Sequence, residues 1–403
     1  MFTAMGYTAN HKKLGSEFSL KNAGHEFKDS GIAYRTYMFQ SGYFNHLPGS
    51  SVVPGIEKDF LTTFPDREIM ENIDFRYPVF MPAGQKKVDK AIILLHGLNE
   101  KSWDKYLPWA SELVLHTGYA VVLFPISFHM NRTPDAWANP RNMAGLSRLR
   151  EKKYKGQEAT SFANAALSER LDNMPERFAL SGYQSVMDLL NLVNHISSGD
   201  HPAFKESTEI HFFGYSIGAF LTQVLMIANP DGIFDKSRFV LFAGGTVFSQ
   251  INGISKLIID KQAFSQLRHY YLNESTWRRK TLRSYVDAMG VKNVARAFMA
   301  MLSPDYFHGL RDRVFSSFKD QLLVFALKED KVFPAEHIIK VFDKSGVWVN
   351  YVDFPYDYTH ETPFPLSNRP EVSEKVDKCF DNLFTEAGDF LKNYSVYGFS
   401  GTA

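Results

Sequence analysis

A serine stands between a short apolar run and a helical pattern near the middle of the chain. Residues 209–213 are mostly apolar and rich in β-forming side chains, which predicts a buried strand. From Ile217 onward, apolar side chains recur at helical spacing. Gly-Tyr-Ser-Ile-Gly at 214–218 joins the two and matches the G-x-S-x-G pattern of a sharp strand-to-helix turn. We expect the turn to expose the Ser216 hydroxyl at the end of a sheet, although a serine that only caps a helix is the alternative.

A serine hydroxyl is a poor nucleophile at neutral pH and needs a neighbouring base. Histidine suits this role, and a carboxylate on its other ring nitrogen would fix the tautomer. Asp330 and His360 follow later apolar runs in the chain order expected for this kind of turn. Glu329 is the alternative acid. Asp330 could instead cap the helix near Pro334, and His360 could be a packed loop residue.

These three side chains need a scaffold that brings their strand ends together. Apolar runs alternate with helical patterns along the chain, at 91–95, 120–126, 209–213, 239–243, 322–327 and 347–352. This alternation predicts an α/β fold with a doubly wound, mostly parallel sheet, in which ligands bind at the carboxyl ends of the strands. Residues 75–81 contain Pro78 and predict an edge strand.

The motifs, in this order and on these strand ends, resemble the α/β-hydrolase superfamily over most of residues 75–394. The resemblance implies that Ser216 is the nucleophile, Asp330 the acid and His360 the base. The matching segments are Gly-Tyr-Ser-Ile-Gly at 214–218, His-Gly at 96–97, Glu-Asp-Lys-Val-Phe-Pro at 329–334 and Thr-His at 359–360.

Acyl transfer also needs donors for the oxyanion of the transition state, and backbone N–H groups commonly supply them. The resemblance implies the N–H of Ile217, directly after the serine, as the first donor. The second donor should come from the loop after His96-Gly97, most simply from Leu98, with Asn99 as the alternative. We expect His96 to support this loop rather than to transfer protons.

Three residues are candidate substrate contacts: Tyr215, His129 and Arg132. Around His129 the chain lacks the Asp- and Gly-rich turn that is usual in the superfamily. Arg132 could bind a substrate carboxylate or phosphate, or it could tether the first insertion, because a lone arginine does both.

The predicted domain organisation has one main domain at 75–394, a preceding N-terminal arm packed on the core at 1–74, and a C-terminal tail at 395–403. Two mainly helical insertions interrupt the main domain at about 133–181 and 250–319. We expect them to form a cap or lid over the site, and the alternative is additional scaffold away from it.

Composition excludes several classes of protein. The chain has 403 residues, of which 44% are hydrophobic and 22% charged, as in soluble globular proteins, and its net charge of +1 predicts no attraction for nucleic acid or an anionic membrane. The single cysteine, Cys379, excludes an internal disulfide. We find no signal peptide, no membrane span, no phosphate-binding glycine loop and no metal-ligand cluster. A cytoplasmic protein without cofactor or metal is the simplest inference.

The expected function is hydrolysis of a carboxylic ester through a covalent acyl-serine, with a small ester or acyl compound as the partner molecule. A thioesterase or a peptidase would use the same residues. A non-catalytic ligand-binding protein on the same scaffold is the alternative from another class, because a fold alone does not establish an activity.

Overall fold

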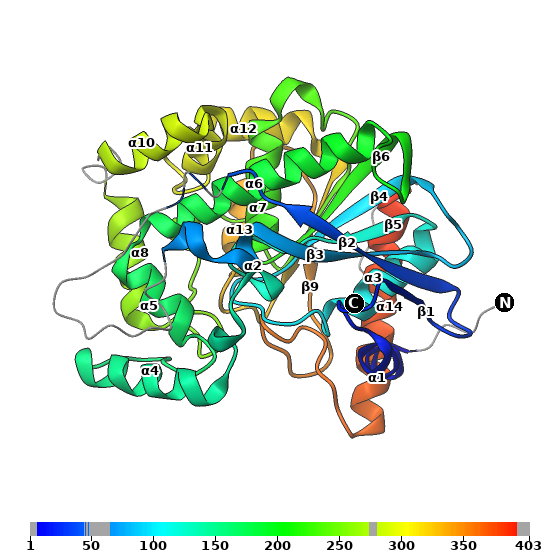
Figure 1. Ribbon diagram of the computed structural model, residues 1–403, viewed down its shortest axis with the longest axis horizontal. Helices are drawn as coiled ribbons and strands as arrows, with labels where there is room; N and C mark the ends of the chain where they lie inside the picture. The colour runs from blue at the N-terminus through cyan, green and yellow to red at the C-terminus, as the bar shows by residue number, and fades with distance from the viewer. Residues whose placement is uncertain (1–5, 44, 46, 48–64, 274–279, 393–403) are drawn as a thin grey trace.

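A nine-stranded sheet forms the centre of the computed structural model, which describes residues 6–43, 45, 47, 65–273 and 280–392 (Figure 1). Its strands, in spatial order, are β1 (Gly24–Glu26), β2 (Ile32–Gln40), β3 (Asp74–Pro82), β5 (Ala120–Leu123), β4 (Val88–Leu95), β6 (Phe204–Tyr215), β7 (Phe239–Phe242), β8 (Leu322–Leu327) and β9 (Val349–Val352).

From β5 to β9, neighbouring strands run parallel, whereas β1, β2 and β3 pair in antiparallel fashion. The central parallel strands are apolar along most of their length because helices cover both of their faces. β4 and β8 show this clearly, since all side chains from Ala91 to Leu95 and from Leu322 to Leu327 are buried. The predicted α/β class with a doubly wound, mostly parallel sheet is therefore confirmed.

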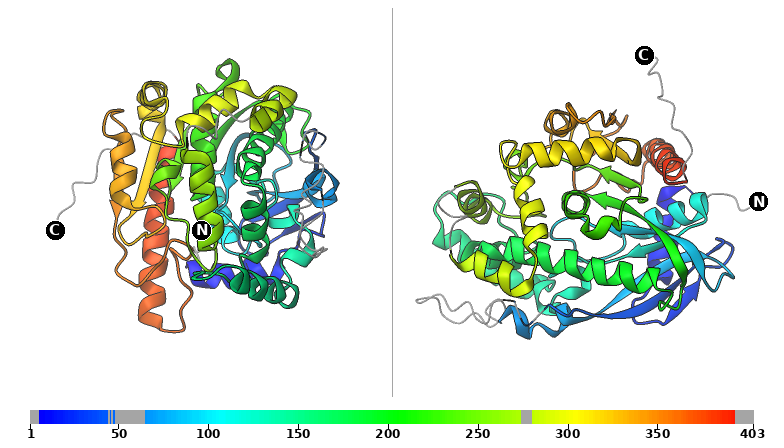
Figure 2. Two further views of the ribbon diagram at one scale, coloured as in Figure 1. Left: turned by 90° about the vertical axis from the view of Figure 1, so that its left-hand side faces the viewer. Right: turned by 90° about the horizontal axis from the view of Figure 1, so that it is seen from above.

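Helices form a layer on each face of the sheet (Figure 2). One layer contains α1 (Tyr7–Glu17), α3 (Tyr106–Thr117) and α14 (Pro370–Leu391); the other contains α6 (Glu176–Ser197), α7 (Ile217–Ala228), α11 (Lys292–Ala300), α12 (His308–Ser317) and α13 (Ala335–Phe342). Each layer buries its own apolar cluster against the sheet. The remaining helices are α2 (Met70–Ile73), α4 (Pro140–Lys153), α5 (Ala165–Asn173), α8 (Lys261–Leu272) and α10 (Lys280–Met289).

The two insertions pack against each other through α5 and α8, at the left of Figure 1. A buried arginine, Arg150 of α4, joins them: its Nε and Nη2 donate to the carboxylate of Asp260 at 2.6 and 3.0 Å, and its Nη1 donates to Glu169 of α5. Asp260 also accepts a hydrogen bond from the backbone of Ala263 and so caps α8. The first insertion is shorter than predicted, since α6 already begins at Glu176.

The first 74 residues do more than form an arm. They supply β1 and β2, and all nine residues of β2 pair with β3. The predicted boundary at residue 75 therefore divides one sheet, and β3 is not an edge strand. Pro78 is tolerated inside the sheet because β5 pairs only with Val79 and Phe80 of β3. The predicted tail at 395–403 lies outside the described residues.

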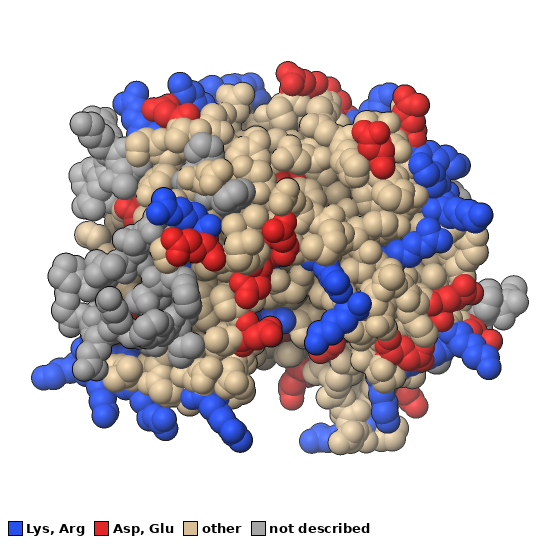
Figure 3. All heavy atoms as spheres, viewed as in Figure 1, with Lys and Arg blue, Asp and Glu red and all other residues tan. Residues whose placement is uncertain are grey.

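Charged side chains of both signs are interspersed over the face shown in Figure 3, apart from a run of basic side chains along α4 at the lower left. This mixture agrees with the net charge of +1. Among the described helices, none combines the length and the apolar character that crossing a membrane requires.

Candidate active site

Ser216 occupies the turn between β6 and α7 with φ 57° and ψ −120°, a conformation that non-glycine residues rarely adopt. The surroundings leave no room for side chains at the two flanking glycines. A Cβ at Gly214 would lie 2.7 Å from the Cα of Ala219, and one at Gly218 would lie 2.3 Å from the carbonyl oxygen of Leu95. The glycines therefore allow helix α7 to approach the end of β4 and hold the serine in its strained turn.

We expect Gly218→Ala to lower the free energy of unfolding by about 1–3 kcal/mol, because the new methyl group would overlap rigid backbone. Gly145→Ala is a matched control. Gly145 also lies inside a helix, α4, but a Cβ there would meet nothing within 4 Å. The control should be unchanged or up to about 1 kcal/mol more stable, from helix propensity. Denaturant titration of both variants measures the difference, and equal stabilities would contradict close packing at this turn.

The structure brings together the three residues that the sequence singled out. The Oγ of Ser216 lies 2.7 Å from Nε2 of His360, and Nδ1 of His360 lies 2.7 Å from Oδ2 of Asp330. All three are buried, with exposures of 3–4%. Because the carboxylate can only accept, Nδ1 of His360 carries the proton and Nε2 is free to accept from the serine hydroxyl.

Asp330 is held by the loop that it begins. Its Oδ1 accepts hydrogen bonds from the backbone N–H groups of Val332 and Phe333, each at 2.8 Å, which leaves Oδ2 for His360. Glu329, the alternative acid, is exposed and does not contact the histidine within the described chain. The geometry thus favours Asp330 over its neighbour.

Two aromatic rings hold His360 in place. Its imidazole stacks on Tyr215 at 5.5 Å and on Phe333 at 5.3 Å, with interplanar angles of 15° and 18°. The hydroxyl of Tyr215 donates to the backbone carbonyl of His360. Burial raises the pKa of Tyr215 well above its ordinary value, so its hydroxyl remains a donor. Tyr215 lines none of the cavities described below, and the prediction that it contacts substrate is wrong: it supports the histidine instead.

The loop after β4 is fixed by His96. Its Nδ1 donates to the carbonyl of Gly97 at 2.8 Å and its Nε2 accepts from the N–H of Ile126 at 2.9 Å. Burial lowers the pKa of His96 well below its ordinary value, so the ring is neutral and its two hydrogen bonds brace the loop. Asn99, at φ 63°, donates through Nδ2 to the carbonyls of Ala163 and Leu257, one in each insertion.

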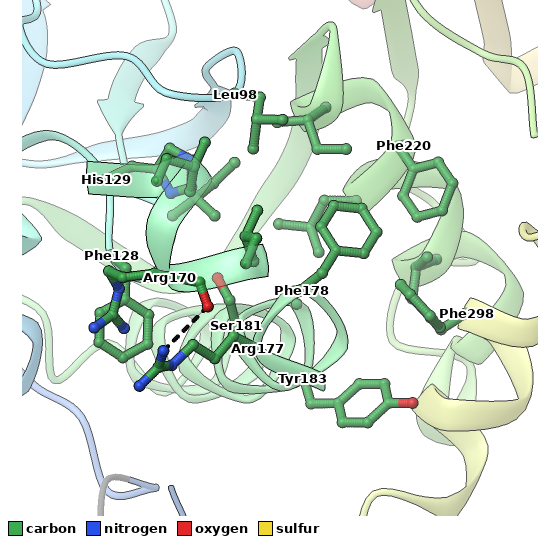
Figure 4. A pocket seen from close by; sticks show the side chains of 17 residues that line it. Leu98, Phe128, His129, Arg170, Arg177, Phe178, Ser181, Tyr183, Phe220 and Phe298 are labelled. Atoms are coloured by element: carbon green, nitrogen blue, oxygen red, sulfur yellow. Dashed lines mark hydrogen bonds between the residues drawn. The ribbon is translucent and has the colours of Figure 1, made fainter. Parts of the chain in front are cut away.

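Two apolar cavities meet beside the serine, and both are lined by Leu98, Phe178 and Ile217. Cavity A, of about 60 Å³, extends toward α5 and α6 (Figure 4). Cavity B, of about 30 Å³, includes Ser216 itself. Since a water needs roughly 10–15 Å³ of such space, cavity A has room for about four to six waters, the size of a short acyl group. Leu98 and Ile217, the predicted oxyanion residues, therefore line both arms of the site.

His129 and Arg132, the other predicted substrate contacts, differ in outcome. His129 lines cavity A and donates through Nδ1 to the carbonyl of Ser127 at 2.9 Å, so its role toward substrate stays a prediction. Arg132 is fully buried and lines none of the cavities. Its guanidinium binds Asn72, Pro125 and Asp188, so the prediction that it binds substrate is wrong. It also does not tether α4 or α5.

Sequence reasoning missed the residues that the first insertion adds to cavity A. They come from α5 and the start of α6, and they include Arg170, Arg177 and Phe178. Arg170 lies in α5 and Arg177 in α6, and arginine side chains are mostly exposed in folded proteins. Both are in fact buried, with exposures of 4% and 3%. No group of His, Cys, Asp or Glu side chains that could hold a metal ion occurs among the residues described.

The fold and the site define an α/β protein with a serine, a histidine and an aspartate in one hydrogen-bonded chain. The family model that matches residues 5–392 is described as a family of unknown function, DUF6051, and the chain belongs to this family. No curated protein matches the chain in sequence.

Solved structures similar to this chain include three esterases. A thermostable esterase from Pseudomonas putida is 12% identical, with a TM-score of 0.45 over 95% of this chain and 89% of that one. Carboxyl esterase 2 from the fungus Tuber melanosporum is 12% identical, with a TM-score of 0.43 over 94% and 97%. A Pyrobaculum calidifontis esterase is 12% identical, with a TM-score of 0.42 over 81% and 83%. At identities and TM-scores this low, the solved structures do not assign a chemistry to this site, and only its own geometry can do so.

Proposed function

We propose that this protein is a serine hydrolase of the α/β-hydrolase superfamily that cleaves a carboxylic ester through a covalent acyl-Ser216 intermediate. The observation that carries the proposal is the hydrogen-bonded chain from Ser216 through His360 to Asp330, which begins on a strained turn beside two apolar cavities. A serine that merely capped α7 would need neither the histidine nor the strain, and Ser216 forms no side-chain cap bond to this helix.

The roles follow from the hydrogen bonds. The Oγ of Ser216 attacks the ester carbonyl while its proton moves to Nε2 of His360, and Asp330 stabilises the imidazolium that forms. The N–H groups of Ile217 and Leu98 are the proposed donors to the oxyanion. His360 then protonates the leaving alcohol, and a water activated by the same nitrogen releases the acid and restores the serine. A thioester would be cleaved by the same steps.

The two insertions are proposed to act as the cap. Side chains of the first line cavity A, among them Leu167 and Leu171, and side chains of the second line cavity B, among them Ile258 and Phe264. The buried Arg150–Asp260 ion pair would keep the two halves of the cap together. A cap of this kind would exclude water from the acyl-enzyme and set the length of chain that each arm accepts.

Labelling with a fluorophosphonate probe tests the proposal. We expect one covalent adduct per chain, and peptide mapping by mass spectrometry should place it on Ser216. A panel of 4-nitrophenyl esters of increasing chain length would then show turnover that falls once the acyl chain exceeds the cavity. A folded protein that takes up no probe and hydrolyses no ester of the panel would instead favour a non-catalytic binding protein.

A further inference from the structure

Positive charge gathers on one side of cavity A (Figure 4). Arg170 and Arg177 both bind one carboxylate, Asp66: Nη2 of Arg170 at 2.8 Å and Nε of Arg177 at 2.9 Å. Asp66 itself is 1% exposed. A single carboxylate is therefore shared between two buried guanidinium groups, and both arginines line the cavity.

Lys101 adds to this charge. It is partly buried in the loop after β4, and it forms no ion pair within the described part of the chain. Burial and the nearby charge of Arg170 lower the pKa of Lys101 to about 8, and Lys101 in turn disfavours protonation of His129. Lys101 is not one of the residues that line cavity A, but its charge acts on Arg170 and His129 of the lining, and the lysine remains mostly cationic at neutral pH.

Two buried polar atoms, Nη1 of Arg170 and Nε2 of His129, belong to residues that line cavity A and have no hydrogen-bond partner among the described residues. Buried donors and acceptors without partners are uncommon in native proteins, so each one requires an explanation, and a bound ligand is one. Arg170 is 4% exposed, and its guanidinium is held near the rings of Phe128 at 4.9 Å and Trp137 at 4.4 Å. Its free N–H is therefore fixed in position.

The rest of the cavity is apolar. Figure 4 shows the charged side chains on one side and the aromatic side chains of Phe178, Phe220 and Phe298 on the other. A ligand that filled the cavity would need an apolar part next to Leu98 and Ile217 and an acceptor, preferably charged, next to Arg170. A carboxylate on a short carbon chain has this form, and a guanidinium N–H is a strong donor to it.

We propose that cavity A binds a substrate arm that ends in a carboxylate, with Arg170 as the donor and Lys101 as a second positive charge. The substrate class is then the monoester of a short dicarboxylic acid. This inference deepens the proposed function and rests on it, because the arm enters beside Ser216 through the residues that both cavities share.

The test compares pairs of 4-nitrophenyl esters that differ only at the far end. In each pair one acid ends in a carboxylate and the other in an isopropyl group of similar shape, for example mono(4-nitrophenyl) adipate and 4-nitrophenyl 6-methylheptanoate; the series continues to suberate. We expect kcat/KM to favour the anionic ester by about 10- to 100-fold at the best length, the usual size of a hydrogen bond to a charged group. A preference for the neutral ester at every length would overturn the proposal.

Amino-acid substitutions test which residues cause the preference for the anionic ester. Lys101→Met should reduce the ratio of anionic to neutral turnover several-fold, and Arg170→Lys, which keeps a charge for Asp66, should reduce it further. Lys205→Met is the matched control, since this exposed lysine at the start of β6 pairs with Asp89 away from the cavity. It removes the same charge and should leave the ratio unchanged. An equal change in Lys101→Met and Lys205→Met would mean a general charge effect and would contradict the assignment.

Binding measured in a protein that cannot hydrolyse esters distinguishes the carboxylate site from the proposed hydrolase function. Calorimetric titration of the Ser216→Ala protein with monomethyl adipate should show binding that Lys101→Met weakens. If neither ester of any pair is hydrolysed but this binding is present, the hydrolase proposal fails and the carboxylate site stands. If the neutral esters are hydrolysed but the anion neither binds nor is preferred, the carboxylate site fails and the hydrolase proposal stands.

Discussion

Ser216→Ala is expected to lower kcat for a 4-nitrophenyl ester by roughly five to six orders of magnitude, the loss seen when the nucleophile of such a triad is removed. The hydroxyl is the only group on the turn that can form the acyl-enzyme, and its single side-chain hydrogen bond goes to His360. Rate measurements under saturating substrate, together with fluorophosphonate labelling, would measure the loss. Labelling should disappear completely.

A measurement of thermal stability distinguishes this loss of activity from misfolding. Removing one buried oxygen that bonds only to a histidine should change the thermal midpoint little. Ser317→Ala is a useful comparison, because its exposed hydroxyl bonds only to the carbonyl of Val314 in its own helix. That variant should keep full activity. Ester hydrolysis that survived in Ser216→Ala would mean that another group performs the reaction, and the proposed mechanism would be wrong.

The sequence predicted the position of the three site residues well because their geometry follows from topology. Ser216 follows β6, Asp330 follows β8 and His360 follows β9, and parallel strands place their carboxyl ends at one edge of the sheet. Each strand could be recognised as a mostly apolar run. Residues more than a hundred positions apart in the chain could therefore be expected to meet without any knowledge of side-chain packing.

The wrong or missing predictions have a different physical origin, because they depend on the direction in which a side chain points and on long-range pairing. Arg132 follows a predicted strand, as the site residues do, but its guanidinium turns inward to Asp188 of α6, a pairing that no local pattern indicates. Tyr215 adjoins the nucleophile but points behind the histidine. The strand β2 was missed because its pairing with β3 is long-range and its side chains are only partly buried. Contacts of this kind are determined by tertiary packing rather than by any local sequence pattern.

The contrast between chain topology and side-chain direction also explains what the sequence did not predict about the two insertions. The sequence predicted two mainly helical insertions, but a buried arginine has the same sequence signature as a solvated one. Arg150 and Arg170 both belong to the first insertion, and each is buried against carboxylates from elsewhere in the chain, Asp260 and Asp66. A buried charge is stable only when it is paired and hydrogen-bonded. Of these two arginines, Arg170, whose Nη1 has no partner among the described residues, is the one that lines a cavity.

Asp330→Asn should lower kcat by about four orders of magnitude while leaving the fold intact, for a reason that lies in the two backbone hydrogen bonds to this residue. The N–H groups of Val332 and Phe333 donate to Oδ1, and only an oxygen can accept them. The asparagine oxygen should therefore occupy this position, and its NH₂ group should face His360. An NH₂ donor forces Nδ1 of the histidine to accept, which moves the ring proton to Nε2.

A histidine protonated at Nε2 cannot take the proton of Ser216, so the nucleophile is no longer activated even though every side chain remains in place. Pre-steady-state measurements should show slow acylation, and nuclear magnetic resonance of the imidazole nitrogens should show the exchanged tautomer. Glu329→Gln is the matched control: it makes the same chemical change one residue away, on an exposed side chain, and should retain nearly full activity. If instead the Glu329 variant lost activity and the Asp330 variant kept it, the acid of the site would be Glu329, because only the carboxylate that orients His360 can produce the tautomer exchange.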